Sequence, residues 1–236
     1  MKRWTECWFE WKGVRCGEMG VRLMALPSRP IPAVQGEKFE IPGRDGFLFS
    51  DRRAARYGIR LVVSCQTADG FSGDALAAWM QGEGLLRFSD EPNRAYRARV
   101  MDEFVRENVF LNFDRQRFDI GFECQPHRYL YPSSEPITLT ENGTIVNPGT
   151  AQSLPRITIE GTGDMLVWIG GRMIDIQGGS VIVDSEIQDC FETDGVTLAN
   201  ARVTMDDFPV IPSGECTVGW TGEVERVTVE GRWRYL

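Results

Sequence analysis

The sequence predicts a mainly β protein that consists of two β-sandwich-like domains, the first of which also carries one short α-helix. Three observations predict this fold class. The chain of 236 residues is long for a single domain and comfortable for two domains of roughly 100 to 130 residues each. Its 25 glycines and 12 prolines are scattered singly along the chain, as the turns of a β protein are. Apolar and polar residues alternate over many short stretches, which is the periodicity of a strand with one buried face.

We place the domain boundary between residues 131 and 132. The chain changes character shortly after this point, where the turn Asn147-Pro148-Gly149 is followed by Pro155 at the start of a strand. The charge also changes, because residues 1–131 contain 20 basic and 18 acidic side chains, whereas residues 132–236 contain 6 and 16. Two units with such different surfaces are expected to face different surroundings.

Composition argues against several classes of protein. The acidic second half argues against nucleic-acid binding, because phosphate contacts need clustered basic side chains. No stretch approaches the ~18 apolar residues of a membrane span, and no apolar segment follows the charges at the N-terminus. We therefore expect a soluble protein that is made in a cytoplasm. The six cysteines form no CxxC pair, so we expect them to be reduced and partly buried.

The first domain is expected to contain mainly short strands. Lys12-Gly13 predicts the turn of a hairpin over residues 4–15, and three prolines make residues 26–32 an extended edge segment. A short strand is expected over 38–41, ended by Pro42-Gly43. The charged middle of residues 47–57 predicts a loop that leaves the body of the domain. Alternation predicts further strands over 59–65, 96–100 and 118–124.

One helix is predicted, over residues 72–82. Ser72 or Asp74 can cap its first turn, and Gly82 can end it. Leu76, Trp79 and Met80 form a stripe at helical spacing. We interpret this stripe as a face that packs on the sheet.

The second domain is expected to be a sandwich of about seven short strands without a helix. Gly170-Gly171 predicts a tight hairpin between strands 166–169 and 172–176. Gly178-Gly179 predicts a second tight turn, before a strand at Val181-Ile182-Val183. The three strands are therefore predicted to form a meander. Later strands are predicted over 216–220 and from 227 to 235.

The sequence does not predict catalysis. His127 is the only histidine, so no histidine-based metal site or triad can be assembled within one chain. No phosphate-binding loop and no nucleophile elbow is present. Carboxylate pairs such as Asp184/Glu186 and Asp206/Asp207 have the pattern of a solvated acidic rim, and Asp189 adds only a weak match to a calcium loop. We therefore expect no catalytic residues, no metal and no cofactor.

A sugar-binding function is an open alternative. Indole rings can stack on sugars, and Trp168 and Trp220 are the candidates, whereas Trp233 lies in an alternating stretch and is expected in the core. The competing interpretation is that all three pack inside the domain. Whether Trp168 and Trp220 are exposed and flank a groove would separate the two.

Six motifs follow one another in an order that resembles a known family. The motifs are Pro42-Gly43-Arg44-Asp45-Gly46, Trp79 with Gly82-Glu83-Gly84, Pro126, Asn147-Pro148-Gly149-Thr150 with Pro155, Asp184-Ser185, and Phe208-Pro209 with Gly214. In this order they resemble the distal tail protein (Dit) family of phages with long, non-contractile tails and of related prophages.

The resemblance implies a structural protein of the virion tail tip, made in the bacterial host cytoplasm. The first domain would form a homo-hexameric ring, and the second would be galectin-like. The ring would join the tail tube protein to the tail-tip hub protein, with the tape-measure protein passing through. The alternative function is a carbohydrate-binding adhesion module that recognises host cell-wall sugar.

A ring requires contacts between two different faces of identical copies. Proline-rich segments, edge strands and the arginine-rich stretch 44–60 are plausible material for them. We expect the arginines of this stretch to pair with acidic groups on a neighbouring copy. The subunit-interface candidates are Arg44, Asp45, Arg52, Arg53 and Arg56.

Overall fold

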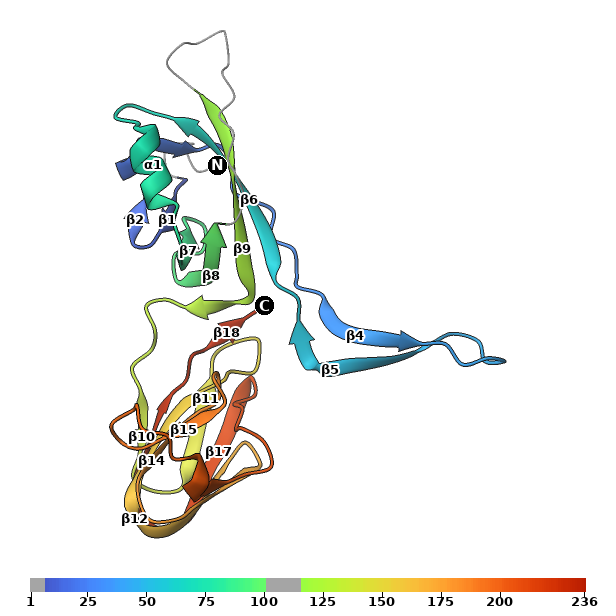
Figure 1. The fold of residues 1–236 in the computed structure, drawn as a ribbon, viewed down its shortest axis with the longest axis vertical. Helices are drawn as coiled ribbons and strands as arrows, with labels where there is room; N and C mark the ends of the chain where they lie inside the picture. Colours follow the sequence, from blue (N-terminus) through green and yellow to red (C-terminus); the bar gives the residue numbers. More distant parts are fainter. Residues whose placement is uncertain (1–6, 101–115) are drawn as a thin grey trace. The chain divides into compact units, whose positions relative to one another are not determined.

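The computed structural model describes residues 7–100 and 116–236, with the backbone alone for residues 51–54. The chain divides into two compact units, one comprising residues 1–128 with residue 236 and the other residues 129–235. Both consist mainly of antiparallel strands (Figure 1), and the predicted β class is confirmed. Among the described helices, none is long and apolar enough to cross a membrane.

Seven strands of the N-terminal unit form one sheet in the order β2-β1-β7-β8-β9-β6-β3. The predicted hairpin is present: β1 and β2 are joined by Lys12 and Gly13, both at positive φ, as a two-residue turn requires. Residues 4–6 of the predicted hairpin lie outside the described residues. The strands are β1 (Phe9–Trp11), β2 (Val14–Arg15), β3 (Val21–Leu23), β6 (Ile59–Thr67), β7 (Glu83–Phe88), β8 (Arg94–Val100) and β9 (Arg117–Leu130).

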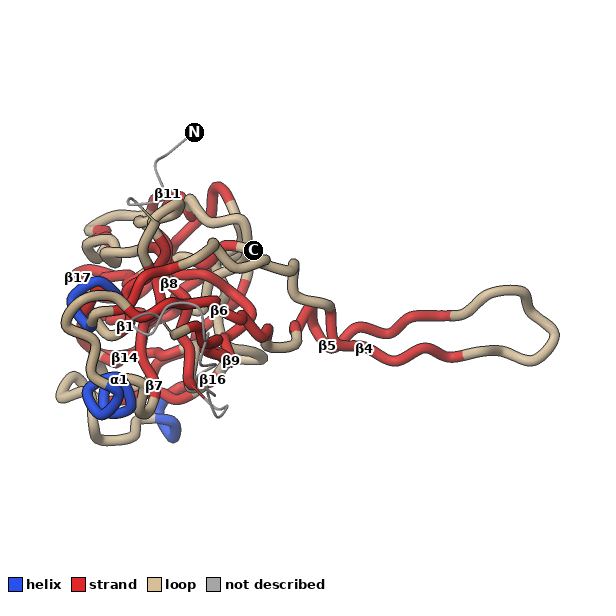
Figure 2. The backbone as a smooth tube through the Cα atoms, turned by 90° about the horizontal axis from the view of Figure 1, so that it is seen from above, coloured by secondary structure: helices blue, strands red, loops and turns tan. Residues whose placement is uncertain are grey.

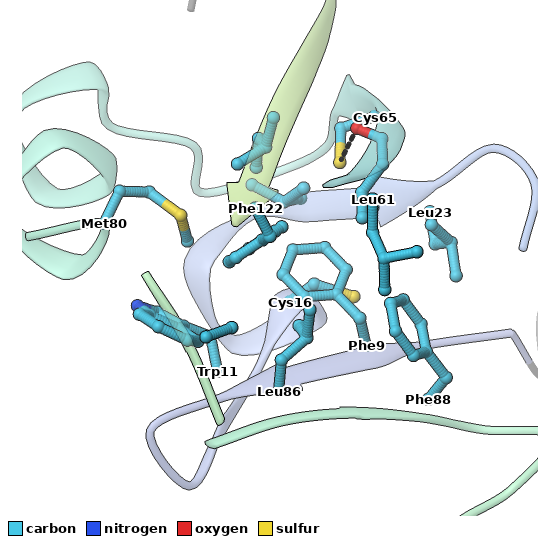
Figure 3. Packing of buried hydrophobic residues seen from close by; sticks show 14 of the residues in the cluster. Phe9, Trp11, Cys16, Leu23, Leu61, Cys65, Met80, Leu86, Phe88 and Phe122 are labelled. Atoms are coloured by element: carbon cyan, nitrogen blue, oxygen red, sulfur yellow. Dashed lines mark hydrogen bonds between the residues drawn. The ribbon is translucent and has the colours of Figure 1, made fainter. Parts of the chain in front are cut away.

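Aromatic side chains fill the core of this unit (Figure 3). Phe9 stacks on Trp79 with ring centroids 5.6 Å apart, and Trp11 meets Phe122 edge-on at 5.2 Å. Each buried indole donates to the other residue's backbone, because Trp11 Nε1 lies 3.1 Å from Trp79 O and Trp79 Nε1 lies 3.1 Å from Trp11 O. The two tryptophans therefore fix the helix to the sheet without an unpaired polar atom.

The predicted helix exists as α1 (Gly73–Trp79), which is shorter than expected. Of the two candidate caps, Ser72 is the one used, since its hydroxyl accepts from Ala75 N at 3.4 Å. Leu76, Trp79 and Met80 are buried, as the stripe predicts. The helix ends at Trp79, and Gly82 follows at positive φ.

All six cysteines are free, and all except Cys7 are buried. Cys65 and Cys124 point into the core, as their strand register predicts. Burial raises the pKa of Cys124 to about 12 and that of Cys190 to about 11. These thiols are therefore packing groups at neutral pH.

One prediction for the N-terminal unit is wrong. Residues 47–57 were expected to form a loop, but β5 (Leu48–Arg56) is a strand paired with β4 (Val34–Phe39) in a separate two-stranded sheet. The cross-strand hydrogen bonds satisfy the backbone groups that the two segments turn toward each other, so the charges of β5 do not prevent it from being a strand. Figures 1 and 2 show this ribbon and its loop.

Two long bent strands build the C-terminal sandwich. β12 (Arg156–Ile169) pairs with β17 (Gly214–Glu230) along nearly its whole length. The first half of β12 also pairs with β14 (Val181–Asp184), which carries β15 (Asp189–Phe191), whereas its second half pairs with β13 (Arg172–Ile176), which carries β16 (Val203–Thr204). β10 (Ile137–Leu139) and β11 (Gly143–Asn147) pair with opposite halves of β17. Both layers therefore share β12 and β17.

This arrangement confirms the Gly170-Gly171 hairpin and corrects the meander. β14 pairs with β12 and not with β13, because the length of β12 offers separate partners to β13 and β14. Register shifts after Glu160 and Thr162 mark the bend. At Gly161 an added Cβ would lie 2.3 Å from Glu223 O, and Gly222 has a φ of +94°. Only glycine fits these two corners.

The Asn147-Pro148-Gly149 turn closes over the last strand, β18 (Arg234–Tyr235). Buried Asn147 donates from Nδ2 to Ala151 O and Ile211 O, each at 3.1 Å, and accepts from Gly149 N at 2.7 Å. Gly149 carries no side chain because a Cβ there would lie 2.3 Å from Arg234 O. One asparagine thus closes its own turn and joins it to the segment that contains Ile211.

Candidate subunit interface on the hairpin arm

The hairpin arm, residues 34–56, is the part of the N-terminal unit whose apolar side chains find no place in its own core. At its base Tyr57 N donates to Ala33 O at 3.0 Å, and Gln35 Nε2 donates to Arg56 O at 3.0 Å. Arg56 Nη1 donates to Pro32 O at 2.6 Å. These bonds hold the arm at its base, and Arg56 is one of the residues that make them.

Cross-strand pairs give both faces of the arm apolar groups. Phe39 lies opposite Leu48 on one face, and Lys38 lies opposite Phe49 on the other. The Phe49 ring crosses the ribbon over Gly36, where an added Cβ would lie 2.5 Å from Phe49 Cζ. An aromatic ring that covers a glycine on the neighbouring strand is a known device for stabilising an exposed ribbon.

The apolar side chains of the arm remain in solvent. Five of them are between 43% and 56% exposed, namely Phe39, Ile41, Phe47, Leu48 and Phe49. β4 and β5 pair only with each other among the described strands. Concentrated exposed aromatic surface of this kind marks an interaction site more often than it marks ordinary protein surface.

The tip of the arm carries charge. Arg44 and Asp45 are exposed in a turn between Gly43 and Gly46, whose φ values are +79° and +82°. Arg44 N closes the turn on Ile41 O at 3.1 Å. Beside the tip, Lys38 Nζ lies 4.7 Å from the centroid of the Phe47 ring, which is the geometry of a cation–π contact.

The five predicted interface residues therefore occupy different positions. Arg44 and Asp45 lie at the solvent-exposed tip, and Arg52 and Arg53 lie on the backbone of β5, with side chains outside the described part of the chain. Arg56 is engaged at the base with Pro32 O. The aromatic residues of the arm were not among the predicted interface residues. Their signal was present, because Phe39, Phe47 and Phe49 flank a Pro-Gly turn on both sides.

Comparison with solved structures gives a match over the whole chain. No protein-family model and no curated protein matches the sequence. The crystal structure of the Dit protein (gp 19.1) of phage SPP1 superposes with a TM-score of 0.73 at 16% identity, covering 98% of this chain and 99% of that one. This chain has the Dit fold. The phage P2 baseplate in its activated conformation with Ca also matches, with a TM-score of 0.46, 8% identity and coverage of 94% and 97%.

In this Dit-fold chain the two candidate sugar-binding tryptophans lie on opposite faces of one layer. Trp220 is the cross-strand partner of buried Val167 and packs against the core of the C-terminal unit. Trp168, one residue further along β12, is paired with Gly219 and points to the outer face. The structure therefore does not bring the two indoles together around one groove. Trp233 is buried, as predicted.

Three of the four carboxylates in the acidic pairs, Asp184, Glu186 and Asp207, form ion pairs. Asp184 binds the Arg232 guanidinium through both oxygens, at 2.7 and 2.8 Å, and Glu186 contacts it at 3.1 Å. Burial alone raises the pKa of Asp184, but the bonds from Arg232 outweigh burial and leave the pKa below its usual value. Asp207 faces Arg172 at 3.5 Å. Within residues 7–100 and 116–236, no three His, Cys, Asp or Glu side chains gather where they could hold a metal ion.

Proposed function

We propose that this protein is a structural component of a phage tail tip and that its copies associate through the hairpin arm into a ring. The observation that carries the proposal is the arm itself, with its exposed apolar residues on both faces. Support comes from the SPP1 Dit protein, which shares the fold and is described as a paradigm of hub adsorption apparatus in Gram-positive infecting phages.

The arm suits contact between unlike surfaces. The arm is a two-stranded ribbon that a neighbouring copy can cover. The large sheet of the same unit is built from other strands and offers a second, different surface. A contact between arm and sheet joins two different patches, and repeated rotation of such a contact closes a ring. We propose six copies, with the tail tube protein, the tape-measure protein and the tail-tip hub protein as further partners. No catalytic role is proposed.

Mass measurement in solution tests this proposal. The wild-type protein should reach six times the 26.7 kDa mass of one chain as its concentration rises, measured by light scattering after size exclusion. The variant Phe39→Asp/Leu48→Asp should remain at the mass of one chain, because a charged pair cannot be buried in an apolar contact. A protein that stays at single-chain mass up to its solubility limit would contradict the ring.

A matched control distinguishes an effect of the arm from the general effect of replacing exposed apolar residues by aspartate. Ile187 and Val196 are 58% and 79% exposed in the C-terminal unit, so Ile187→Asp/Val196→Asp should assemble as the wild type does. The charged residues need their own variant. Arg44→Ala/Arg52→Ala/Arg53→Ala spares Arg56, which holds the base of the arm. Assembly of this variant at full strength in moderate salt would show that the arginines make no ion pairs between copies.

A further inference from the structure

The outer face of one layer of the C-terminal sandwich presents an indole that the described residues cover only in part. Trp168 is half-buried, and its strand neighbours on either side are Gly219 of β17 and Met173 of β13. Among the described residues, none accepts a hydrogen bond from Trp168 Nε1. A tryptophan whose N–H has no partner within the fold has both a ring face and a donor to offer.

Gly219, which has no side chain, leaves open space on the sheet surface beside this indole. Cross-strand partners point to the same face of a sheet, so a side chain at Gly219 would stand next to Trp168. A Cβ built there would meet only Asn142, at 3.9 Å from Cγ and 4.0 Å from Oδ1. Trp168 and Asn142 therefore border the same open position from opposite sides.

Asn142 is oriented by the backbone. Its Oδ1 accepts from Trp220 N at 2.9 Å, which fixes the oxygen toward the strand. The amide nitrogen then points away from the strand, and within the described residues it has no partner. This nitrogen offers two donors beside the open position.

The next row of the same face adds polar groups. Leu166 is flanked by Thr221 on one side and Asp175 on the other. The Asp175 carboxylate forms no ion pair or side-chain hydrogen bond with any described residue. The two rows contain no lysine or arginine. Arg172, at the adjoining turn, faces Asp207 at 3.5 Å.

We infer that this face, which comprises Asn142, Gly219, Trp168, Met173, Thr221 and Asp175, is a binding site for one neutral pyranose sugar. The indole stacks on the apolar C–H face of the ring, the amide of Asn142 donates to a hydroxyl, and Asp175 accepts from another. The uncompensated carboxylate of Asp175 disfavours an anionic sugar. Trp220 takes no part, because it faces the core.

Saturation-transfer NMR on the full-length protein tests this inference, and it works equally well for a monomer and for a ring. The probes are methyl β-D-galactopyranoside, methyl β-D-glucopyranoside and N-acetyl-D-glucosamine, with N-acetylneuraminic acid as the anionic control. At least one neutral probe should receive saturation at its ring C–H protons, with a dissociation constant on the order of 1 to 10 mM for a single shallow site. No saturation of any neutral probe, or equal saturation of the anionic one, overturns the inference.

Variants locate the site. Trp168→Ala should abolish the signal, and Asn142→Ala or Asp175→Ala should weaken binding by about fivefold or more, the effect of one lost hydrogen bond. The matched control is Tyr57→Ala, which removes an exposed aromatic side chain from the N-terminal unit and should leave binding unchanged. Asn142 and Asp175 are outside the core, so their variants remain informative even if Trp168→Ala is unstable. Unchanged binding in all three site variants contradicts the assignment. Ring assembly of the same samples tests the tail-tip role separately.

Discussion

Two regions of the N-terminal unit use the same kinds of side chain for opposite purposes. Phe9 stacks on Trp79, hydrogen bonds join Trp79 to Trp11, and all three side chains are buried. Phe39, Phe47 and Phe49 of the hairpin arm are about half-exposed. The difference lies in the surroundings, because β1 belongs to a large sheet and its side chains pack against Trp79 of α1, while β4 and β5 pair only with each other among the described strands. Aromatic residues therefore indicate a core only where the topology can close over them.

The largest effect on stability is expected from a substitution in the buried aromatic core of the N-terminal unit. Trp11→Ala removes a fully buried indole and leaves the Trp79 carbonyl without its donor, whereas the backbone carbonyl at position 11 still accepts from Trp79 Nε1. The free energy of unfolding should fall by about 3 to 5 kcal/mol, measured by urea denaturation of the full chain. A loss below about 1 kcal/mol would show that the core relaxes around the cavity.

The next largest effect is expected from charged residues, which can also be compared between a buried and an exposed position. The Asp184–Arg232 pair lies inside the C-terminal unit, whereas Arg44 and Asp45 on the arm are solvated. Asp184→Asn should cost about 2 to 3 kcal/mol of unfolding free energy, less than a fully buried pair because Arg232 keeps Glu186 and some solvent contact. Arg44→Ala should cost under about 0.5 kcal/mol.

The same pair predicts an acid dependence. Because the pKa of Asp184 is lowered in the folded protein, its contribution to stability is full above its ordinary unfolded pKa of 3.8 and is lost as pH falls through the lower folded value. Denaturation of the wild type between pH 5 and pH 2, compared with Asp184→Asn, should show that the difference between them shrinks toward the acid end. A difference that stays constant over this range would contradict the ion pair.

The smallest effect is expected on the arm. Phe47→Ala should change the unfolding free energy of the single chain by less than about 0.5 kcal/mol, because the side chain is already 56% exposed. The same substitution should weaken assembly when measured by mass. If it destabilises the single chain as strongly as Trp11→Ala does, the arm is packed in solution and its aromatic residues do not differ from those of the core.

The sequence predicts features that depend on local chemistry. Lys12-Gly13 and Gly170-Gly171 form the expected turns, Ser72 caps the helix, and alternation orients Cys65 and Cys124 inward. The sequence also distinguishes the two candidate sugar-binding tryptophans by alternation, although the prediction did not use it. Trp168 lies between Val167 and Ile169 and points outward, whereas Trp220 follows Cys216 and Val218 in register and points inward.

Features that depend on distant partners could not be predicted in this way. β5 is a strand only because β4 pairs with it, against the charged composition of Asp51-Arg52-Arg53. β14 joins β12 because that strand is long enough to hold two neighbours in succession. The partner of Asp184 is 48 residues away, and no local spacing in the sequence indicates it.

The sharing of β12 and β17 by both layers of the C-terminal sandwich has a mechanical consequence. A load that pulls on the unit along these strands is resisted by many backbone hydrogen bonds in shear at the same moment, since neither strand stops at the corner between the layers. Layers built from separate strands could be peeled apart one bond at a time. Continuous strands make the unit stiff along one direction, and they let tension applied to one layer reach the other without crossing a loop.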